Sequence, residues 1–197
     1  MNPARTDRSR RRFCTTAVAA VVCTLGALRA PAQEVGSDHG RVSPHVPVPD
    51  VRVRAADGTS QGLASLLRGR ATALHLMFTS CPTLCPIEAA IFQRVQLLVP
   101  DQVERGIQLL SLSIDPENDS PAALKAWLDK FRARAGWIAV APAPKDLGVL
   151  LELFGQGRNA IENHATQVNI INRKGELIWR TPELPSGDSI ADILGKV

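Results

Sequence analysis

The sequence has little positive charge outside its N-terminus. The 197-residue chain has a formal net charge of +4, but residues 1–32 contain six arginines against a single aspartate, so the remainder is slightly acidic. Nucleic-acid binding depends on lysines and arginines that neutralise phosphates along a patch or stripe. The remainder shows no such stripe, and we therefore expect no nucleic-acid partner.

The apolar stretch near the N-terminus is too short to span a membrane comfortably. It runs from Phe13 to Leu28 and is interrupted by threonines and a glycine, whereas a spanning helix needs about 20 apolar residues. An arginine cluster that resembles the twin-arginine export pattern precedes it, and the small-residue site Ala30-Pro31-Ala32 follows it. Residues 1–32 therefore predict a cleaved export signal and a periplasmic protein. If the leader were retained, it would tether the protein to the membrane.

Cysteine is scarce, which argues against a disulfide-stapled scaffold. The chain has four cysteines, and cleavage after residue 32 would remove Cys14 and Cys23. The two that remain, Cys81 and Cys85, are four positions apart. A bridge between them would close a loop too small to stabilise the fold much, because the stabilisation grows with loop length. We therefore expect Cys81 and Cys85 to serve chemistry rather than packing.

Apolar periodicity predicts an α/β fold over residues 49–197, preceded by a flexible lead-in at 33–48. Near-continuous apolar runs predict buried strands, and His75 within the first run is expected to be a buried, hydrogen-bonded core residue. Helical spacing follows each run, with Ile87, Ile91, Val95 and Leu98 as one apolar face. Strands are predicted at 51–54, 71–78, 107–114 and 136–142, helices at 86–99, 121–131, 145–157 and 186–197, and a hairpin at 166–180.

This order of elements indicates βαβ units in a largely parallel sheet, to which the final hairpin adds an antiparallel pair. A helix that directly follows a cysteine loop suggests a thioredoxin-like fold, in which helices flank a central mixed sheet and an N-terminal strand extends it. Reactive groups of open α/β sheets lie at the carboxyl ends of strands. Cys81 occupies such a position, just after the predicted strand 71–78.

Cys81 and Cys85 would lie about one turn apart on one side of a helix start. This geometry allows a disulfide, a redox pair or two ligands for a soft metal ion. The N-terminus of a helix favours thiolate, because its N–H groups and positive potential lower the pKa of thiols. Thiolate is the form that attacks disulfides and also the form that binds metal, so the loop alone does not separate these functions.

A metal held by two thiolates needs a further ligand, and the chain offers four histidines. His39 and His45 fall in the predicted lead-in, and His75 falls in a core strand. His164 precedes the predicted hairpin, and in a thioredoxin-like fold the loop that enters this strand approaches the cysteine loop. Two thiolates and one imidazole form a soft site suited to copper, especially Cu(I). Zinc in a closed structural site would need a fourth ligand.

These residues carry a family resemblance. "FTSCPTLCP", then "SIDPENDSP", then a histidine before "VNIINRKGEL" resemble the Sco/SenC family of copper-handling proteins. The resemblance implies that Cys81, Cys85 and His164 bind one copper ion. It also implies a role in assembling the binuclear copper site of cytochrome c oxidase subunit II. The expected partner is therefore this subunit or another periplasmic copper protein. The chain departs from the family pattern at Asn163, Ala165 and Thr83, but none of these departures removes a ligand. It matches the pattern at Asp115 and Asp119, which we expect to cap and order the loop before the helix.

Other classes of protein use similar cysteine loops. A thiol-disulfide oxidoreductase would use one of Cys81 and Cys85 to attack and the other to resolve, although such enzymes favour a spacing one residue shorter. A peroxiredoxin-like peroxidase would need an arginine near its reactive cysteine, and none stands out locally. The sequence thus favours a copper metallochaperone rather than an enzyme, with thiol-disulfide reductase activity as the alternative.

Overall fold

The computed structural model describes residues 39–157, 160–163 and 165–197. The predicted export signal, residues 1–32, lies outside this part of the chain. The strands are β1 Gly40–Pro47, β2 Arg52–Ala55, β3 Ser60–Gly62, β4 Ala71–Met77, β5 Ile107–Ser113, β6 Trp137–Pro142, β7 Gln167–Ile171 and β8 Glu176–Glu183. The helices are α1 Leu63–Leu67, α2 Leu84–Leu98, α3 Pro121–Lys130, the 3-10 helix η1 Pro144–Asp146, α4 Leu147–Leu153, α5 Ala160–Asn163 and α6 Gly187–Leu194.

The strands form one mixed sheet in the order β1-β8-β7-β4-β5-β6-β2-β3. The only parallel pairs in the described part of the chain are β4 with β5 and β5 with β6, and the other neighbours are antiparallel. The central mixed sheet is therefore confirmed, but its parallel portion is smaller than the alternating pattern indicated. The strands β1, β2 and β3 account for the difference, because each joins the sheet antiparallel near an edge.

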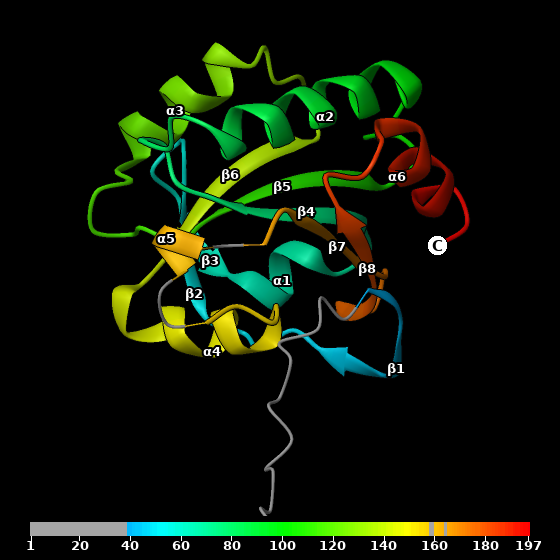
Figure 1. The fold of residues 1–197 in the computed structure, drawn as a ribbon, viewed down its shortest axis with the longest axis horizontal. Helices are drawn as coiled ribbons and strands as arrows, with labels where there is room; N and C mark the ends of the chain where they lie inside the picture. Colours follow the sequence, from blue (N-terminus) through cyan, green and yellow to red (C-terminus); the bar gives the residue numbers. More distant parts are fainter. Residues whose placement is uncertain (1–38, 158–159, 164) are drawn as a thin grey trace, which may run out of the picture. The chain divides into compact units, whose positions relative to one another are not determined.

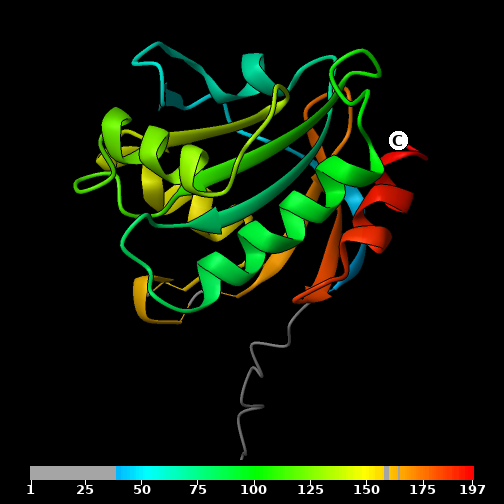
Figure 2. The ribbon, with the colours of Figure 1, turned by 90° about the horizontal axis from the view of Figure 1, so that it is seen from above.

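Helices cover both faces of the sheet. Figure 1 shows α2 and α3 on one side and α1 and α4 on the other, and Figure 2 shows α2 and α3 from above, lying over the same face. Each face has its own apolar core, with β4 contributing alternate residues to the two cores: Ala71, Ala73 and Met77 face α2, whereas Leu74 and Leu76 face α1 and α4. None of the helices in the described residues is long and apolar enough to cross a membrane.

Residues 40–47 correct the prediction of a flexible lead-in at 33–48. They form β1, which pairs antiparallel with β8 and so supplies the outermost strand on that side of the sheet. Val42 and Val46 pack against the core that contains α1 and α4. The prolines of this segment suggested flexibility, and two of them, Pro44 and Pro47, lie within β1. Prolines are compatible with an edge strand, where one side of the backbone has no partner.

The buried face of α2 overlaps the predicted one but excludes Ile87: Val95 is buried as predicted, and Ile91 and Leu98 pack against the same core, partly buried. Ile87 is 48% exposed, whereas Cys85, Glu88, Phe92 and Val95 are buried. These residues follow a spacing of three or four from Cys85, so they share one face of the helix. The face of α2 that carries Cys85 and the large Phe92 ring packs into the core. Ile87 lies outside this face and is therefore left at the surface.

Candidate metal centre

Cys81 and Cys85 lie in the loop that leaves β4 and in the first turn of α2. Cys81 comes four residues after the end of β4, where its N–H donates to the carbonyl of Phe78 at 3.1 Å, and Cys85 is the second residue of α2. The strand thus delivers the loop to the carboxyl edge of the parallel strands, as predicted for a reactive group in an open α/β sheet.

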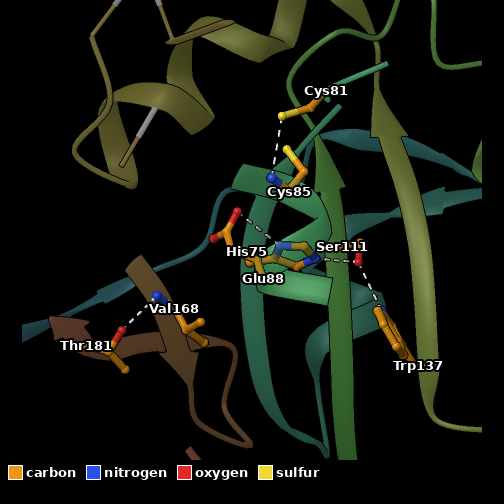
Figure 3. A network of polar contacts seen from close by, with 8 residues as sticks. All are labelled: His75, Cys81, Cys85, Glu88, Ser111, Trp137, Val168 and Thr181. Atoms are coloured by element: carbon orange, nitrogen blue, oxygen red, sulfur yellow. Dashed lines mark hydrogen bonds and ion pairs between the residues drawn. The ribbon is translucent and has the colours of Figure 1, made fainter. Parts of the chain in front are cut away.

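The two cysteines are adjacent and buried. The backbone N–H of Cys85 points at Cys81 Sγ at 3.5 Å, so Cys81 partners one of the amides that a helix start leaves without an intrahelical acceptor. Figure 3 shows both sulfurs at the same end of α2. Cys81 is 7% exposed and Cys85 is fully buried, and both are in the reduced thiol form. The predicted placement on one side of the helix start is confirmed.

The surroundings push the pKa values of the two thiols in opposite directions. Burial raises the pKa of Cys81, but the N–H groups of Cys85 and Thr83, with the neighbouring thiol, outweigh it, so the pKa lies below its ordinary value. Deeper burial raises the pKa of Cys85 well above its ordinary value, and the negative charges of Cys81 and Glu88 add to the effect. Cys81 is therefore the more acidic and more accessible sulfur.

A buried carboxylate holds the cysteine loop in place. Asp119 accepts hydrogen bonds from Thr79 at two points, 3.1 Å from the backbone N and 2.6 Å from Oγ1, and from Ser113 Oγ at 2.6 Å. The predicted role of Asp119 in ordering the loop before α3 is therefore incomplete, since its carboxylate also anchors the cysteine loop two residues before Cys81. Asp115 has the local role, because it accepts from the Asn118 amide at 2.9 Å.

A polar network lies beneath Cys85 within the core. It links Glu88 on α2, His75 on β4, Ser111 on β5 and the indole of Trp137 on β6, and Figure 3 shows the four residues in sequence. All four are buried. The prediction of a buried, hydrogen-bonded His75 is confirmed. Glu88 was not singled out, although its spacing of three from Cys85 on the buried face of α2 was a signal for it.

His164, the predicted third ligand, lies outside the described residues. On one side of it, helix α5 ends at Asn163. On the other side, the backbone N–H of Ala165 donates to Gln156 Oε1 at 2.8 Å. The strand β7 then runs antiparallel to β4, with Asn169 opposite Leu74. The start of β7 therefore lies beside the carboxyl end of β4, and the chain enters β7 at the sheet edge from which the cysteine loop emerges.

The donor set suits a soft metal ion. Two sulfurs that meet at the start of α2, one of them with a lowered pKa, match the preference of Cu(I) for thiolates. In the described residues, no group of three or more histidine, cysteine, aspartate or glutamate side chains is gathered to hold a metal. A third ligand of these residue types, if one joins Cys81 and Cys85, would have to come from outside the described residues, as His164 does, or from another molecule.

Comparisons with known proteins place this chain among similar sequences and structures. A family model described as SCO1/SenC matches residues 56–197. A SCO2-like protein of Rickettsia typhi is 32% identical over 121 residues, which is 57% of this chain and 59% of the relative. The chain spans about half the length of the curated relatives it matches.

Solved structures share the fold. Yeast Sco1 with copper bound has a TM-score of 0.65 at 17% identity and covers 79% of this chain and 93% of its own. BsSco, described as a Sco-family cytochrome c oxidase assembly protein with a disulfide switch, has a TM-score of 0.63 at 20% identity. The match covers 77% of this chain and 93% of the BsSco chain. The predicted thioredoxin-like fold is thus confirmed. The family model spans well over half of the sequence and includes both cysteines, so the chain belongs to the SCO1/SenC family.

Proposed function

We propose that this protein is a periplasmic copper-binding metallochaperone that assists assembly of the binuclear copper site of cytochrome c oxidase. The observation that carries the proposal is the pair of reduced thiols, Cys81 and Cys85, placed together at the start of α2 in a member of the SCO1/SenC family. The Sco family comprises copper-binding proteins involved in cytochrome c oxidase assembly, and yeast Sco1 has been solved with copper bound.

Cys81, Cys85 and His164 are the proposed ligands of one copper ion. The two sulfurs would supply thiolates, and the imidazole would complete a three-coordinate soft site. The entry of the chain into β7 at the cysteine edge of the sheet supports His164 as the third ligand. Copper would be the cargo of this protein, and the proposed recipient is subunit II of the oxidase or another periplasmic copper protein.

The N-terminal sequence supports the periplasmic part of the proposal. Residues 1–32 combine a basic start, an apolar stretch and a small-residue site, which is typical of an exported chain. Export would place the thiols in the compartment that periplasmic copper proteins occupy. A retained leader would hold the same domain at the membrane surface.

A second function, reduction of a partner disulfide, is favoured by the difference between the two thiols. Cys81 is the more accessible and has the lowered pKa, so it would attack, and the buried Cys85 would resolve. Attack would join Cys81 to one partner sulfur and release the other as a thiol. Attack by Cys85 on Cys81 would then form the Cys81–Cys85 disulfide and release the second partner thiol, so two electrons and two protons would pass to the partner.

Substitution of His164 tests the copper proposal. We expect His164→Ala to bind one Cu(I) at least about tenfold more weakly than the wild type, because it loses a ligand, and even the loss of an outer-shell partner costs 10–100-fold. The measurement is an anaerobic titration of reduced protein against a competing Cu(I) chelator. His45→Ala is the matched control, since His45 lies on edge strand β1 beside Glu176 and its loss should leave the affinity unchanged. Equal affinities of His164→Ala and the wild type would contradict the three-ligand site.

A further inference from the structure

One end of the molecule carries an excess of positive charge that the copper and disulfide chemistry does not use. This amino end is where β4, β5 and β6 begin, and it consists of the loops 68–70, 99–106, 131–136 and 172–175. The loops contain seven arginines and lysines against two carboxylates, whereas the rest of residues 33–197 has ten against sixteen. The seven are scattered along the sequence and come together only in the fold. They are Arg68, Arg70, Arg105, Arg132, Arg134, Arg173 and Lys174, and all are exposed.

Hydrogen bonds join these loops into one surface. The guanidinium of Arg173, in the turn between β7 and β8, donates to the carbonyl of Gly69 at 3.2 Å and to that of Arg105 at 2.9 Å. The amide of Gln102 donates to the carbonyl of Ala135 at 2.6 Å. Three of the loops also line a common hollow, whose side chains include Arg68, Arg70 and Val103. The positive side chains therefore belong to a continuous surface.

Most of these positive charges are not compensated by carboxylates. Among the described residues, the one ion pair of the set joins Arg105 to Asp101 at 3.8 Å. Arg70 donates to the neutral amide oxygen of Gln108 at 3.0 Å, and the acceptors of Arg173 are neutral carbonyls. Like charges that gather without counter-charges repel one another and oppose folding. Their accumulation at this end therefore indicates an anionic partner.

An anionic membrane fits the amino end better than an acidic protein does. The charges are spread over four loops, and a lipid surface offers phosphate groups without a fixed register. Arginine suits phosphate because its planar fork can donate two hydrogen bonds to it. A protein partner would usually require a central cluster of apolar or aromatic anchors. Of the large apolar side chains in the four loops, only Val103 is exposed, at 55%.

We propose that the amino end of this protein binds the surface of an anionic membrane through the phosphate groups of its lipids. The negative potential of such a surface attracts basic residues that come near it. The cysteine loop leaves β4 at the opposite end of that strand, which spans seven residues, or about 20 Å. Docking by the amino end would thus hold the cysteine loop away from the bilayer and open to a partner protein. The inference is independent of the copper proposal, because none of the seven residues is a proposed ligand.

The test is cosedimentation with lipid vesicles of the protein that remains after removal of residues 1–32. This is the form that export would produce, and it lacks the arginines of the leader. Vesicles of phosphatidylcholine with about one-third phosphatidylglycerol provide the anionic surface, and pure phosphatidylcholine provides the neutral one. We expect binding to the anionic vesicles only. The partition coefficient should fall by at least about tenfold between about 0.05 M and about 0.5 M salt, because salt screens exposed charges.

A triple variant locates the membrane-binding surface. Arg68→Gln, Arg134→Gln and Lys174→Gln together remove charges from three of the four loops. All three residues are exposed, so their replacement should leave the fold intact, which circular dichroism checks. Each basic residue near an anionic membrane contributes about fivefold to binding. We therefore expect the partition coefficient of the triple variant to fall by about tenfold or more.

The matched control removes three positive charges near the other end of the sheet. It combines Arg52→Gln, Arg54→Gln and Lys145→Gln, since β2 pairs with the carboxyl end of β6 and Lys145 follows that strand. Its partition coefficient should fall by no more than about twofold. Equal losses in the two triple variants would overturn the proposal, because binding would then follow net charge alone. Equal binding to neutral and anionic vesicles would also overturn it, as would binding to soluble polyglutamate but to neither kind of vesicle.

Discussion

Replacing Cys85 with serine is expected to lower the affinity of the reduced protein for Cu(I) by about 100-fold or more. A serine hydroxyl is a hard, protonated donor that Cu(I) does not favour, whereas a thiolate is a soft one. Cys85 is fully buried, so water cannot easily take the place of the lost sulfur. Competition with a chromophoric Cu(I) chelator under anaerobic conditions measures the change.

The residue between the two cysteines supplies the matched control for Cys85→Ser. Thr83 is exposed, and its side chain makes no capping hydrogen bond to α2. Thr83→Ser should therefore bind Cu(I) as the wild type does. If Cys85→Ser also kept the wild-type affinity, the buried sulfur would not be a ligand, and the two-thiolate site would be wrong.

Replacing Asp119 with alanine is expected to lower the free energy of unfolding by about 3 kcal/mol. The substitution removes the acceptor of three donors, which are the N–H and the hydroxyl of Thr79 and the buried hydroxyl of Ser113. Thr79 would no longer be tied to the loop before α3, so the segment that leads to Cys81 should also loosen. Chemical denaturation measures the stability, and the alkylation rate of Cys81 measures the loosening, with a faster rate expected in the variant.

An exposed aspartate provides the comparison for Asp119→Ala. Asp129 pairs with Lys125 at 2.7 Å on the surface of α3, where both side chains are about two-thirds exposed. Such pairs contribute little, so Asp129→Ala should cost about 0.5 kcal/mol or less and leave the alkylation rate unchanged. Equal losses of stability in the two variants would show that the Asp119 carboxylate does not anchor the cysteine loop.

Local patterns in the sequence were sufficient to predict the elements that carry the site. The apolar run before Cys81 became β4, with every residue buried. Ser120 caps α3 as expected, since its side chain accepts from the N–H of Ala123 at 3.2 Å. These features depend on neighbouring residues alone, through strand burial, proline at a helix start and a capping hydroxyl. The adjacency of Cys81 and Cys85 followed for the same reason.

Contacts between distant residues were beyond such patterns. Asp119 is forty positions from Thr79, and no local rule connects a loop before one helix to the loop before another. The helical spacing in α2 fitted two overlapping faces, and tertiary packing selected the one with Cys85 and Phe92 over the one with Ile87. The partners of His75 come from strand β5 and helix α2, so its burial could be predicted but its link to Glu88 could not.

X-ray absorption at the copper edge, on reduced protein loaded with one Cu(I) per chain, tests the central claim most directly. The method counts the sulfur and nitrogen atoms bound to the metal. Ligation by Cys81, Cys85 and His164 predicts two sulfurs and one nitrogen, with one sulfur lost in Cys85→Ser and the nitrogen lost in His164→Ala. A copper ion with a single sulfur neighbour or none in the wild-type protein would contradict the account.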